Sequence, residues 1–350
     1  MDHAPPEPAL RISDALQAPV TSRRVGLELA TRLRYPSGVL IRERLEDLPA
    51  LGVPLHLALG VFDGVHVGHQ AVIARAVEAA ARDGGLAGLL TFDPHPIRVI
   101  APNKAPTNLL ETLNHKARVV GDLGLQLFIP LHFDMEFAKM EAAEFIAQLT
   151  AAPVRTIAVG EDWRFGHHRS GDVTFLEQAA SRRGFKLESV PPVMHDGERI
   201  SSTRIRQAIR DGNLEAAEQM LGRPYSVSGT VVEGKKLGRT IGFPTANLAT
   251  GEAQLPPDGV WAVHAQLADG RNLTGVANLG LRPTVGGDHR VFEVHLFDFA
   301  REIYGEELEI RFHSYLRHEL KFPSLDALRL QIQQDAAAAR ELFGVSKSQH

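Results

Sequence analysis

The sequence contains no cysteine, which excludes disulfide bonds and thiolate chemistry and fits a cytoplasmic protein. Lysine and arginine number 38 against 42 aspartate and glutamate, and the formal net charge is −4. The chain thus lacks the basic surplus typical of nucleic-acid-binding proteins, and any phosphate site must be built locally. No apolar run approaches the length of a membrane span. From the charge balance we therefore predict no nucleic-acid partner, and from the apolar runs no membrane partner.

What the chain does have is length and alternation. Its 350 residues, 44% of them hydrophobic, are enough for two soluble domains of ordinary size. Residues 1–36 carry several prolines, no apolar signal core and no sustained periodicity, so we expect a mobile extension. From 37 to 212, short apolar runs alternate with amphipathic segments, which predicts a doubly wound α/β sheet with ligands beyond the carboxyl ends of its strands.

The elements expected in this first domain follow from periodicity. The strands are Leu55–Val61, Leu86–Phe92, Leu125–Pro130, Val154–Val159 and Lys186–Val193, and the helices are Gln70–Arg82, Leu109–Leu123, Met135–Thr150, Val173–Arg183 and Thr203–Arg210.

The pattern changes after a linker helix and turn at residues 213–224. From 225 to 346, short runs with period-two character are separated by glycine-containing turns such as 268–270 and 286–288, which predicts a β-barrel or sandwich. These strands are Val227–Val232, Val260–Leu267, Leu273–Leu279, Val291–Phe297 and Leu308–Tyr315. A helix over Ser324–Phe343 follows, with Ser324 as its N-cap.

The first motif is Leu57–Gln70, which reads LALGVFDGVHVGHQ. A buried strand passes through glycines into a helix, so that backbone N–H groups at the helix start form a site for anions. His66 and His69, three apart in that first turn, can reach one phosphate and donate hydrogen bonds where negative charge grows. Two other interpretations are a zinc-binding HxxH pair and a pair of hydrogen-bonded structural histidines. The remaining candidate residues here are Gly60, Phe62, Asp63, Gly64 and Gly68.

Two later segments also lie at strand ends or helix starts. Residues 159–166 (VGEDWRFG) form a loop with an acid, a base and two aromatics, a pattern that serves packing more often than binding. Residues 200–206 (ISSTRIR) place Ser201 and Ser202 as N-cap candidates, with Arg206 one turn further on and able to bind a phosphate. A plain capped helix with solvated arginines is the alternative for this segment.

The second domain carries the most specific pattern, GKKLGRTIGFPTAN over residues 234–247. Glycines allow backbone amides to approach phosphates, while lysines and arginine supply charge. The Thr245 hydroxyl and the Asn247 side-chain carbonyl are hard oxygen donors suited to magnesium. A flexible hairpin with solvated lysines is the competing interpretation. The candidate phosphate-binding residues are Gly234, Lys235, Gly238, Arg239, Gly242 and Pro244.

Taken together, these motifs resemble the bacterial bifunctional riboflavin kinase/FAD synthetases. The first domain is similar to their nucleotidyltransferase half in the GxFDGxHxGHQ, VGxDFRFG and ISSTxIR patterns, and the second to riboflavin kinases in GxxxGRxxGFPTxN. Further matches are NxGxRPT from Asn278, FEVH from Phe292 and RxExKF from Arg317. The sequence departs from the family at Val61, where asparagine often stands, and at Trp163, where phenylalanine is commoner.

For the first domain, the resemblance implies a Rossmann-like FMN adenylyltransferase. The FMN phosphate attacks the α-phosphorus of ATP and releases pyrophosphate, and no general base is needed because the attacking phosphate is already anionic. His66 and His69 would stabilise the transition state and Arg206 would hold the outer phosphates. Ser202 and Thr203 would donate hydrogen bonds. Further implied contacts, with nucleotide or flavin, are Ser201, Asp162, Asp93 and Phe165.

For the second domain, the resemblance implies a riboflavin-kinase-type β-barrel with a C-terminal helix that converts riboflavin to FMN with MgATP. Glu293 matches the catalytic base, while Thr245 and Asn247 would hold Mg²⁺. Without the family, Glu293 is one polar residue in an alternating strand. Arg317 and Phe322 would line the flavin pocket. The expected ligands are therefore ATP, Mg²⁺, riboflavin, FMN and FAD, all of them small.

Two other functions compete with this one. A nucleotidyltransferase acting on another phosphorylated acceptor would leave the second motif without a role. The second function is non-enzymatic and has two forms. One is a flavin carrier, which would not need a phosphate turn in each domain. The other is a regulatory RNA-binding module, which the acidic balance and the absence of interleaved basic and aromatic strand motifs disfavour.

Overall fold

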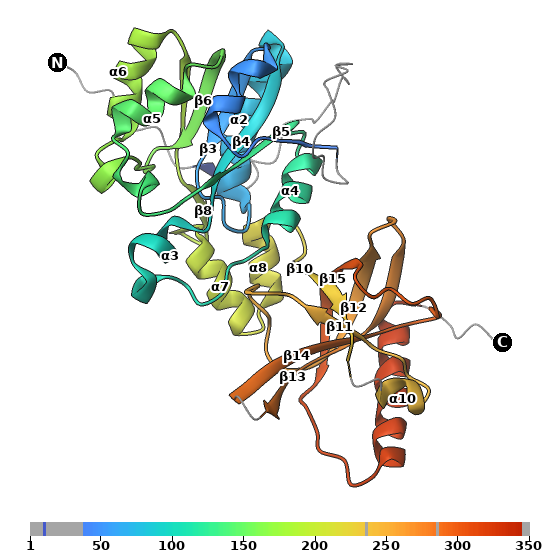
Figure 1. The fold of residues 1–350 in the computed structure, drawn as a ribbon. Coiled ribbons are helices and arrows are strands. Elements are labelled where there is room, and N and C mark those ends of the chain that lie inside the picture. Colours follow the sequence, from blue (N-terminus) through green and yellow to red (C-terminus); the bar gives the residue numbers. More distant parts are fainter. Residues whose placement is uncertain (1–9, 12–37, 235–236, 285–286, 345–350) are drawn as a thin grey trace. The chain divides into compact units, whose positions relative to one another are not determined.

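The structure is a computed structural model that describes residues 10–11, 38–234, 237–284 and 287–344. Its described residues fall into two compact units (Figure 1). The first unit runs to Leu109 and then from Leu113 to Arg204. The second comprises Leu110–Thr112 and begins again at Ile205.

The first unit is built on a six-stranded parallel sheet with the order β2-β5-β4-β3-β6-β7. The chain adds β4 and β5 on one side of β3 and later returns to add β6 and β7 on the other. The order therefore reverses between β3 and β6, where doubly wound sheets bind ligands. The strands are β2 (Leu40–Ile41), β3 (Leu55–Leu59), β4 (Leu86–Asp93), β5 (Leu127–His132), β6 (Val154–Gly160) and β7 (Lys186–Val190).

Helices cover both faces of this sheet, which explains why β3 is buried along its whole length. Helix α2 packs on β3, β4 and β6, while the leucines of β3 belong to one buried hydrophobic cluster with Phe145 of α5 and Leu176 of α6. The α-helices are α2 (Val67–Asp83), α3 (Pro96–Ile100), α4 (Leu113–Asp122), α5 (Ala142–Leu149) and α6 (Val173–Arg183), and the 3-10 turns are Leu45–Asp47, Pro49–Leu51, Pro102–Lys104, Phe137–Lys139 and His167–Arg169. Helix α7 (Ser202–Arg210) begins in this unit, and its residues from Ile205 on belong to the second.

A second, three-stranded sheet in this unit has the order β1-β8-β9. It consists of Leu10–Arg11, Val193–His195 and Glu198–Arg199, with β1 parallel to β8. Residues 10 and 11 lie within the segment 1–36, for which we expected a mobile extension, and the rest of that segment lies outside the described residues. Their partner strand is almost two hundred residues away, so local periodicity could not reveal the pairing.

The second unit is a closed six-stranded barrel with the order β10-β11-β14-β13-β12-β15. Of the two predicted architectures, barrel and sandwich, the barrel is therefore the one present. Trp261, Phe292 and Phe312 are buried, whereas Val260 and Ala262 pack with Ala336 and Ala339 of the C-terminal helix. The strands are β10 (Ser226–Val232), β11 (Ala246–Ala249), β12 (Gly259–Leu267), β13 (Asn272–Thr284), β14 (Gly287–Leu296) and β15 (Glu307–Arg317), and the helices are α8 (Leu214–Leu221), α9 (Leu237–Thr240) and α10 (Leu325–Leu342).

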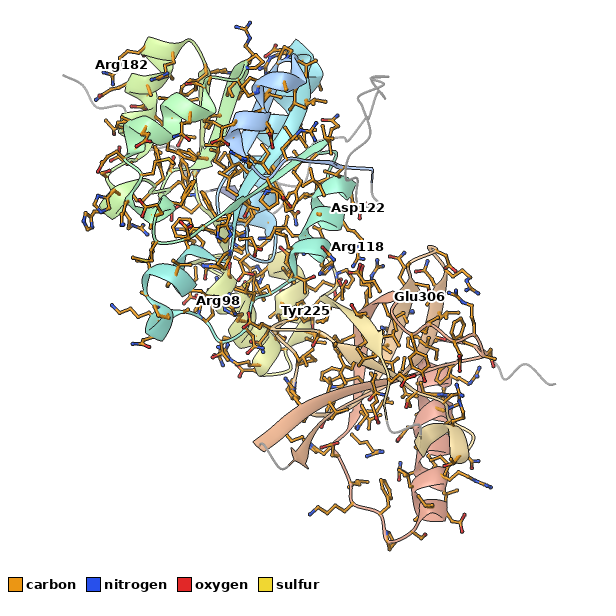
Figure 2. All side chains as sticks on the ribbon, viewed as in Figure 1. Arg98, Arg118, Asp122, Arg182, Tyr225 and Glu306 are labelled. Atoms are coloured by element: carbon orange, nitrogen blue, oxygen red, sulfur yellow. The ribbon has the colours of Figure 1, made fainter. Side chains whose placement is uncertain are left out.

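Tyr225, labelled in Figure 2 just before β10, anchors the start of the barrel. Its hydroxyl donates to the carbonyl oxygens of Leu110 and Gln254. Beside it the buried carboxylate of Glu111 pairs with Arg223 at 3.4 Å. Burial lowers the pKa of Arg223, and the opposite charge of Glu111 counters that effect. These bonds explain why Leu110–Thr112 belongs to the second unit.

The predicted fold class, a doubly wound α/β domain followed by a barrel with a C-terminal helix, is confirmed. Two expected elements differ in detail, and one strand was not expected. The helix over Met135–Thr150 is divided into a 3-10 turn and α5, and the strand over Lys186–Val193 is interrupted at its two prolines. The strand β11 over Ala246–Ala249 was not among the predicted elements. The turn expected at 286–288 lies partly outside the described residues.

Candidate active sites

The HxGH segment lies at the carboxyl end of β3, next to the point where strand order reverses. His66 is the N-cap of α2, and its Nδ1 accepts the backbone N–H of His69 at 3.3 Å. A neutral His66 with an accepting Nδ1 carries its proton on Nε2, as a donor. The two imidazole rings stack with centroids 3.5 Å apart, and the Phe62 ring meets His69 edge-on at 5.2 Å. The helix start therefore holds two histidines in fixed orientation.

Glycines and left-handed residues shape this turn. A Cβ on Gly68 would lie 3.2 Å from Cε1 of His66, and a Cβ on Gly60 would lie 3.1 Å from the Phe62 ring. Phe62 and Val65 have φ of 51° and 37°, a region that non-glycine residues rarely occupy. Strain of this kind persists only where the surroundings hold it and is common at functional sites.

Two buried side chains fix the start of the turn through the carbonyl oxygen of Val61. It accepts hydrogen bonds from Thr91 Oγ1 at 2.8 Å and from Lys116 Nζ at 3.0 Å. Lys116 comes from α4, and no motif indicated that it serves this turn. Among the described residues, no group of three or more His, Cys, Asp or Glu side chains is placed to hold a metal ion.

The second helix start, at α7, is tied directly to the first. Ser202 Oγ donates to the backbone carbonyl of Asp63 at 2.8 Å, and Ser201 Oγ accepts the N–H of Arg204 at 3.3 Å. Arg206 lies one turn into α7 and is only 9% exposed, whereas Thr203 is exposed. Arg204 donates to backbone carbonyls of residues 195, 198 and 199. Neither arginine is merely solvated, which weakens the plain capped-helix alternative.

The loop after β6 contains one exposed and one buried candidate residue. Its Asp162 is exposed and forms an ion pair with Arg199 at 2.6 Å, so it connects this loop to β9 just before α7. Phe165 is buried in the sheet's core and stacks on Trp163 with centroids 4.4 Å apart. Its position fits the packing alternative for this loop. Asp93 is exposed at the carboxyl end of β4.

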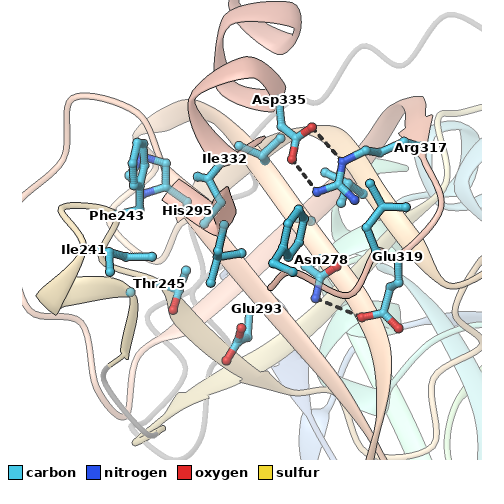
Figure 3. A pocket seen from close by; sticks show the side chains of 17 residues that line it. Ile241, Phe243, Thr245, Asn278, Glu293, His295, Arg317, Glu319, Ile332 and Asp335 are labelled. Carbon is cyan, nitrogen blue, oxygen red and sulfur yellow. Dashed lines mark hydrogen bonds and ion pairs between the residues drawn. The ribbon is translucent and has the colours of Figure 1, made fainter. Parts of the chain in front are cut away.

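The barrel carries a cavity of about 400 Å³, drawn in Figure 3. Strands of the barrel form one side of it, and Leu328, Ile332 and Asp335 of α10 form another. Glu293 and His295 line the cavity, while Phe292 and Val294, which alternate with them along β14, are buried. Strand β14 therefore alternates between buried and polar residues as expected, but its polar side chains line a cavity.

Register places several candidate residues in one row around the barrel. Glu293 of β14 stands opposite Asn247 of β11 on one side and Asn278 of β13 on the other. Asn278 in turn stands opposite Val260, which stands opposite Arg317 of β15. Residues paired across strands present their side chains on the same face. Sequence positions seventy residues apart thus meet on one surface.

Close backbone approaches shape the glycine-rich loop around Thr245 and Asn247. A Cβ on Gly234 would lie 2.2 Å from Asn247 Nδ2, and a Cβ on Gly238 would lie 2.2 Å from the carbonyl oxygen of Phe243. Thr245 lines the cavity on the same side as Glu293 (Figure 3), whereas Asn247 is not among its lining residues. Arg239 pairs with Glu302 at 2.9 Å, Gly242 has φ of +85° and Pro244 is exposed. Lys235 lies outside the described residues.

The segment after β15 closes the other end of the cavity. Arg317 makes two hydrogen bonds to Asp335 of α10, at 2.8 and 2.7 Å, and its guanidinium lies 5.9 Å from the ring centroid of Phe322. Asn278 Nδ2 donates to Glu319 Oε1 at 3.3 Å, next to Gly280. Arg317 and Phe322 were expected here. Asp335 was not, because only tertiary packing brings it to this site.

His295 is another cavity-lining residue that the predicted site omitted. Its Nδ1 lies 2.8 Å from the carbonyl oxygen of Pro244, and burial lowers its pKa, although that hydrogen bond acts in the opposite direction. The alternation of β14 was the available signal, since a residue two positions after Glu293 lies on the same face.

Comparisons with known proteins agree with this geometry. The FAD synthetase family profile matches residues 53–204, and the riboflavin kinase profile matches residues 221–343. A bifunctional riboflavin kinase/FMN adenylyltransferase of Escherichia coli (strain K12) is 41% identical over 293 residues, covering 83% of this chain and 93% of the relative. Its counterpart from Pseudomonas fluorescens is 40% identical over 291 residues, covering 82% and 93%. A crystal structure described as a macrolide-efflux protein from Streptococcus pneumoniae matches with a TM-score of 0.73 and 32% identity, covering 87% of this chain and 99% of that one.

The fold and these matches define a two-domain transferase, in which a parallel-sheet domain is followed by a barrel. The chain belongs to the bifunctional riboflavin kinase/FMN adenylyltransferase family, and the resemblance seen in its sequence is confirmed. Within the ranges that the structure covers, no helix combines the length and apolar character needed to cross a membrane.

Proposed function

We propose that this chain carries both activities of its family. Residues 225–346 phosphorylate riboflavin to FMN with ATP, and residues 37–212 adenylylate FMN to FAD and release pyrophosphate. Residues 213–224 join the two, and residues 1–36 belong to neither catalytic domain. Because ATP is made and flavin cofactors are used inside the cell, the protein is expected to act in the cytoplasm.

In the adenylyltransferase, the carrying observation is the hydrogen bond from Ser202 to the backbone of Asp63, which joins two helix N-termini. Both starts direct N–H groups and positive dipole ends toward one region, which suits a triphosphate. His66 and His69 then donate to oxygens on the α-phosphorus as charge develops there. The FMN phosphate is already anionic, so the attack needs no base.

The other polar groups of the first domain have supporting roles. Arg206 binds the outer phosphates, and Ser201 and Thr203 complete the donor set of the helix start. Asp162 acts from the exposed end of the β6 loop, where Arg199 orients it. Asp93, exposed at the end of β4, stays a candidate flavin contact, whereas Phe165 supports its loop from inside the core.

In the kinase, the carrying observation is the row of side chains that places Asn247 and Asn278 on either side of Glu293. Glu293 accepts the proton of the riboflavin 5′-hydroxyl as that oxygen attacks the γ-phosphorus of ATP. Arg317 and Phe322 bound the flavin end of the cavity, whose size is in the range of small-molecule sites. The glycines 234, 238 and 242 and Arg239 lie along the loop that faces the phosphates.

The residues around Thr245 fit a magnesium ion. The Thr245 hydroxyl and the Asn247 side-chain carbonyl are two neutral oxygen donors, and magnesium commonly binds one or two protein groups while substrate phosphates and water complete its shell. When bound, Mg²⁺ would neutralise charge on the β- and γ-phosphates. A smaller hollow on the other side of Thr245, lined by Arg239, Pro244 and Tyr304, is where we place the rest of the nucleotide.

A chromatographic time course with riboflavin, ATP and magnesium tests the proposal. FMN should appear first and then give way to FAD as pyrophosphate is released. FMN accumulating without FAD would leave the kinase and point to a different acceptor for the first domain. No turnover of riboflavin or of supplied FMN would favour the flavin carrier instead.

A further inference from the structure

The turn that carries Thr245 lies where a β-ladder ends. Strand β11 pairs with β14 through Asn247 opposite Glu293 and Ala246 opposite Val294, and the pairing stops there. Pro244 has no N–H with which to continue a ladder. The backbone on the N-terminal side of Thr245 therefore needs another anchor.

A side chain supplies that anchor. His295 follows Val294 on β14, and its Nδ1 lies 2.8 Å from the carbonyl oxygen of Pro244. A carbonyl oxygen only accepts, so Nδ1 must carry the proton and donate. The Phe243 ring meets the imidazole edge-on at 5.2 Å and the Phe297 ring lies 5.9 Å away, so the histidine has little freedom to turn.

The turn is held on both sides of Thr245. On its N-terminal side, the N–H of Phe243 donates to the carbonyl of Gly238 at 2.7 Å. On its C-terminal side, Asn247 is fixed by the ladder and by its close approach to Gly234. The bond from His295 falls on the residue directly before Thr245, where the ladder between β11 and β14 does not reach.

We propose that His295 is a positioning residue of the kinase site, which fixes the Pro244 carbonyl and thereby the Thr245 hydroxyl for the metal–nucleotide complex. This inference rests on the proposed roles of Thr245 and Asn247. His295 touches no reacting atom in this account. It acts as the outer partner that orients an inner ligand, a role whose loss lowers metal affinity about 10- to 100-fold in other metal sites.

Asparagine and glutamine at position 295 separate this role from general packing. The amide nitrogen of asparagine can take the place of Nδ1, whereas that of glutamine takes the place of Nε2. His295→Asn should therefore keep the bond to Pro244 and His295→Gln should lose it, although both are polar amides. His264→Gln is the matched control, because His264 also stands on a barrel strand but lies outside the cavity lining.

The measurement is binding of Mn²⁺ to the full-length protein with saturating ADP, with free Mn²⁺ followed by electron paramagnetic resonance. The part of the binding that Asn247→Ala removes defines the kinase site and separates it from any site in the first domain. At the kinase site defined in this way, His295→Gln should bind Mn²⁺ about tenfold more weakly than the unchanged protein. The Mn²⁺ affinity of His295→Asn and of His264→Gln should stay within about threefold of that of the unchanged protein, which is less than the loss expected when an outer partner is removed.

Two results would overturn the inference alone, namely wild-type affinity in His295→Gln or equal weakening in His295→Asn. A third result has a wider reach. If Asn247→Ala removes no Mn²⁺ binding, the metal site of the proposed function is wrong and the role of His295 fails with it. Supplied FMN should be adenylylated at the normal rate in every variant, and loss of that activity would contradict a role confined to the kinase.

Discussion

Single glycines decide where functional side chains can lie in both domains. Gly68 leaves room for the His66 ring, Gly234 for the Asn247 amide and Gly280 for the Glu319 carboxylate. At each position a Cβ would fall within 3.2 Å of the functional side chain. These glycines therefore matter because they leave room for a neighbouring side chain. Binding of phosphate by their backbone amides is not their only possible role.

Gly280→Ala tests this principle at the flavin end of the kinase cavity. A Cβ there would lie 1.9 Å from Glu319 Oε1, so Glu319 must leave Asn278 and the segment that closes the cavity must shift. We expect roughly tenfold weaker riboflavin binding, since overpacking of this kind costs about 1–3 kcal/mol. Quenching of flavin fluorescence measures the affinity. In a Glu319→Ala background the Gly280→Ala substitution should have little effect, and an equal effect there would contradict the steric account.

Glu293→Gln tests the proposed role of Glu293 as the proton acceptor of the kinase. The amide keeps the shape of the side chain but cannot accept the hydroxyl proton, so FMN formation should fall about 10²- to 10⁴-fold. Adenylylation of supplied FMN should stay unchanged, and both rates can be read from one chromatographic assay. Loss of both activities in folded protein would contradict the assignment of Glu293 to one site.

At the scale of whole elements, local patterns predicted what local forces determine. Helix α6 over Val173–Arg183 agrees with its apolar periodicity, and Ser324 caps α10 by accepting the N–H of Ala327 at 3.2 Å. The predicted helix Met135–Thr150 fails where tertiary contacts dominate. Met140 is extended and its carbonyl accepts the N–H of His167, while Gly166 packs against Ala142.

The candidate sites follow the same division. The sequence could propose His66, His69, Ser202 and Thr245 as candidates, because each lies in a compact motif. Asp335 and Lys116 lie in ordinary helices, and only the folded chain brings them to Arg317 and to the carbonyl of Val61. The strand β1 was missed for the same reason, since its partner is remote in sequence.

A buried ion pair adds to the apolar contacts that hold helix α10 over the cavity. Asp335 is 7% exposed and bonds twice to Arg317, so Asp335→Ala would leave that guanidinium largely buried without its partner carboxylate. The barrel should lose about 3 kcal/mol of unfolding free energy. Urea unfolding in a Trp163→Phe background measures it, because Trp261 is then the only tryptophan and is buried in the barrel.

The matched control for this substitution is Glu341→Gln, an exposed position near the end of the same helix. It should change the free energy of unfolding by no more than about 0.5 kcal/mol, as is usual for surface positions. Equal effects of the two substitutions would mean that the Arg317–Asp335 pair has no special part in holding α10.

At the scale of the whole molecule, the two proposed reactions use separate motifs of the chain. The parallel-sheet domain carries two histidines and two joined helix starts, and the barrel carries the proposed proton acceptor, the proposed oxygen donors and a cavity. No residue assigned to the kinase mechanism comes from the parallel sheet. FMN, the product of the barrel, is a small molecule that can diffuse from one site to another, and it is the acceptor for the other site. The chemistry therefore requires two sites but not two sites in one chain.

This independence predicts that two inactive proteins can complement each other. His66→Ala should still make FMN from riboflavin but no FAD, and Glu293→Gln should make FAD only from supplied FMN. An equimolar mixture with riboflavin, ATP and magnesium should therefore form FAD after a lag in which FMN accumulates in solution. The lag should shorten as total protein concentration rises, because the intermediate must diffuse between molecules. Absence of FAD from the mixture, with each protein retaining its own half-reaction, would mean that FMN passes only between sites of the same chain.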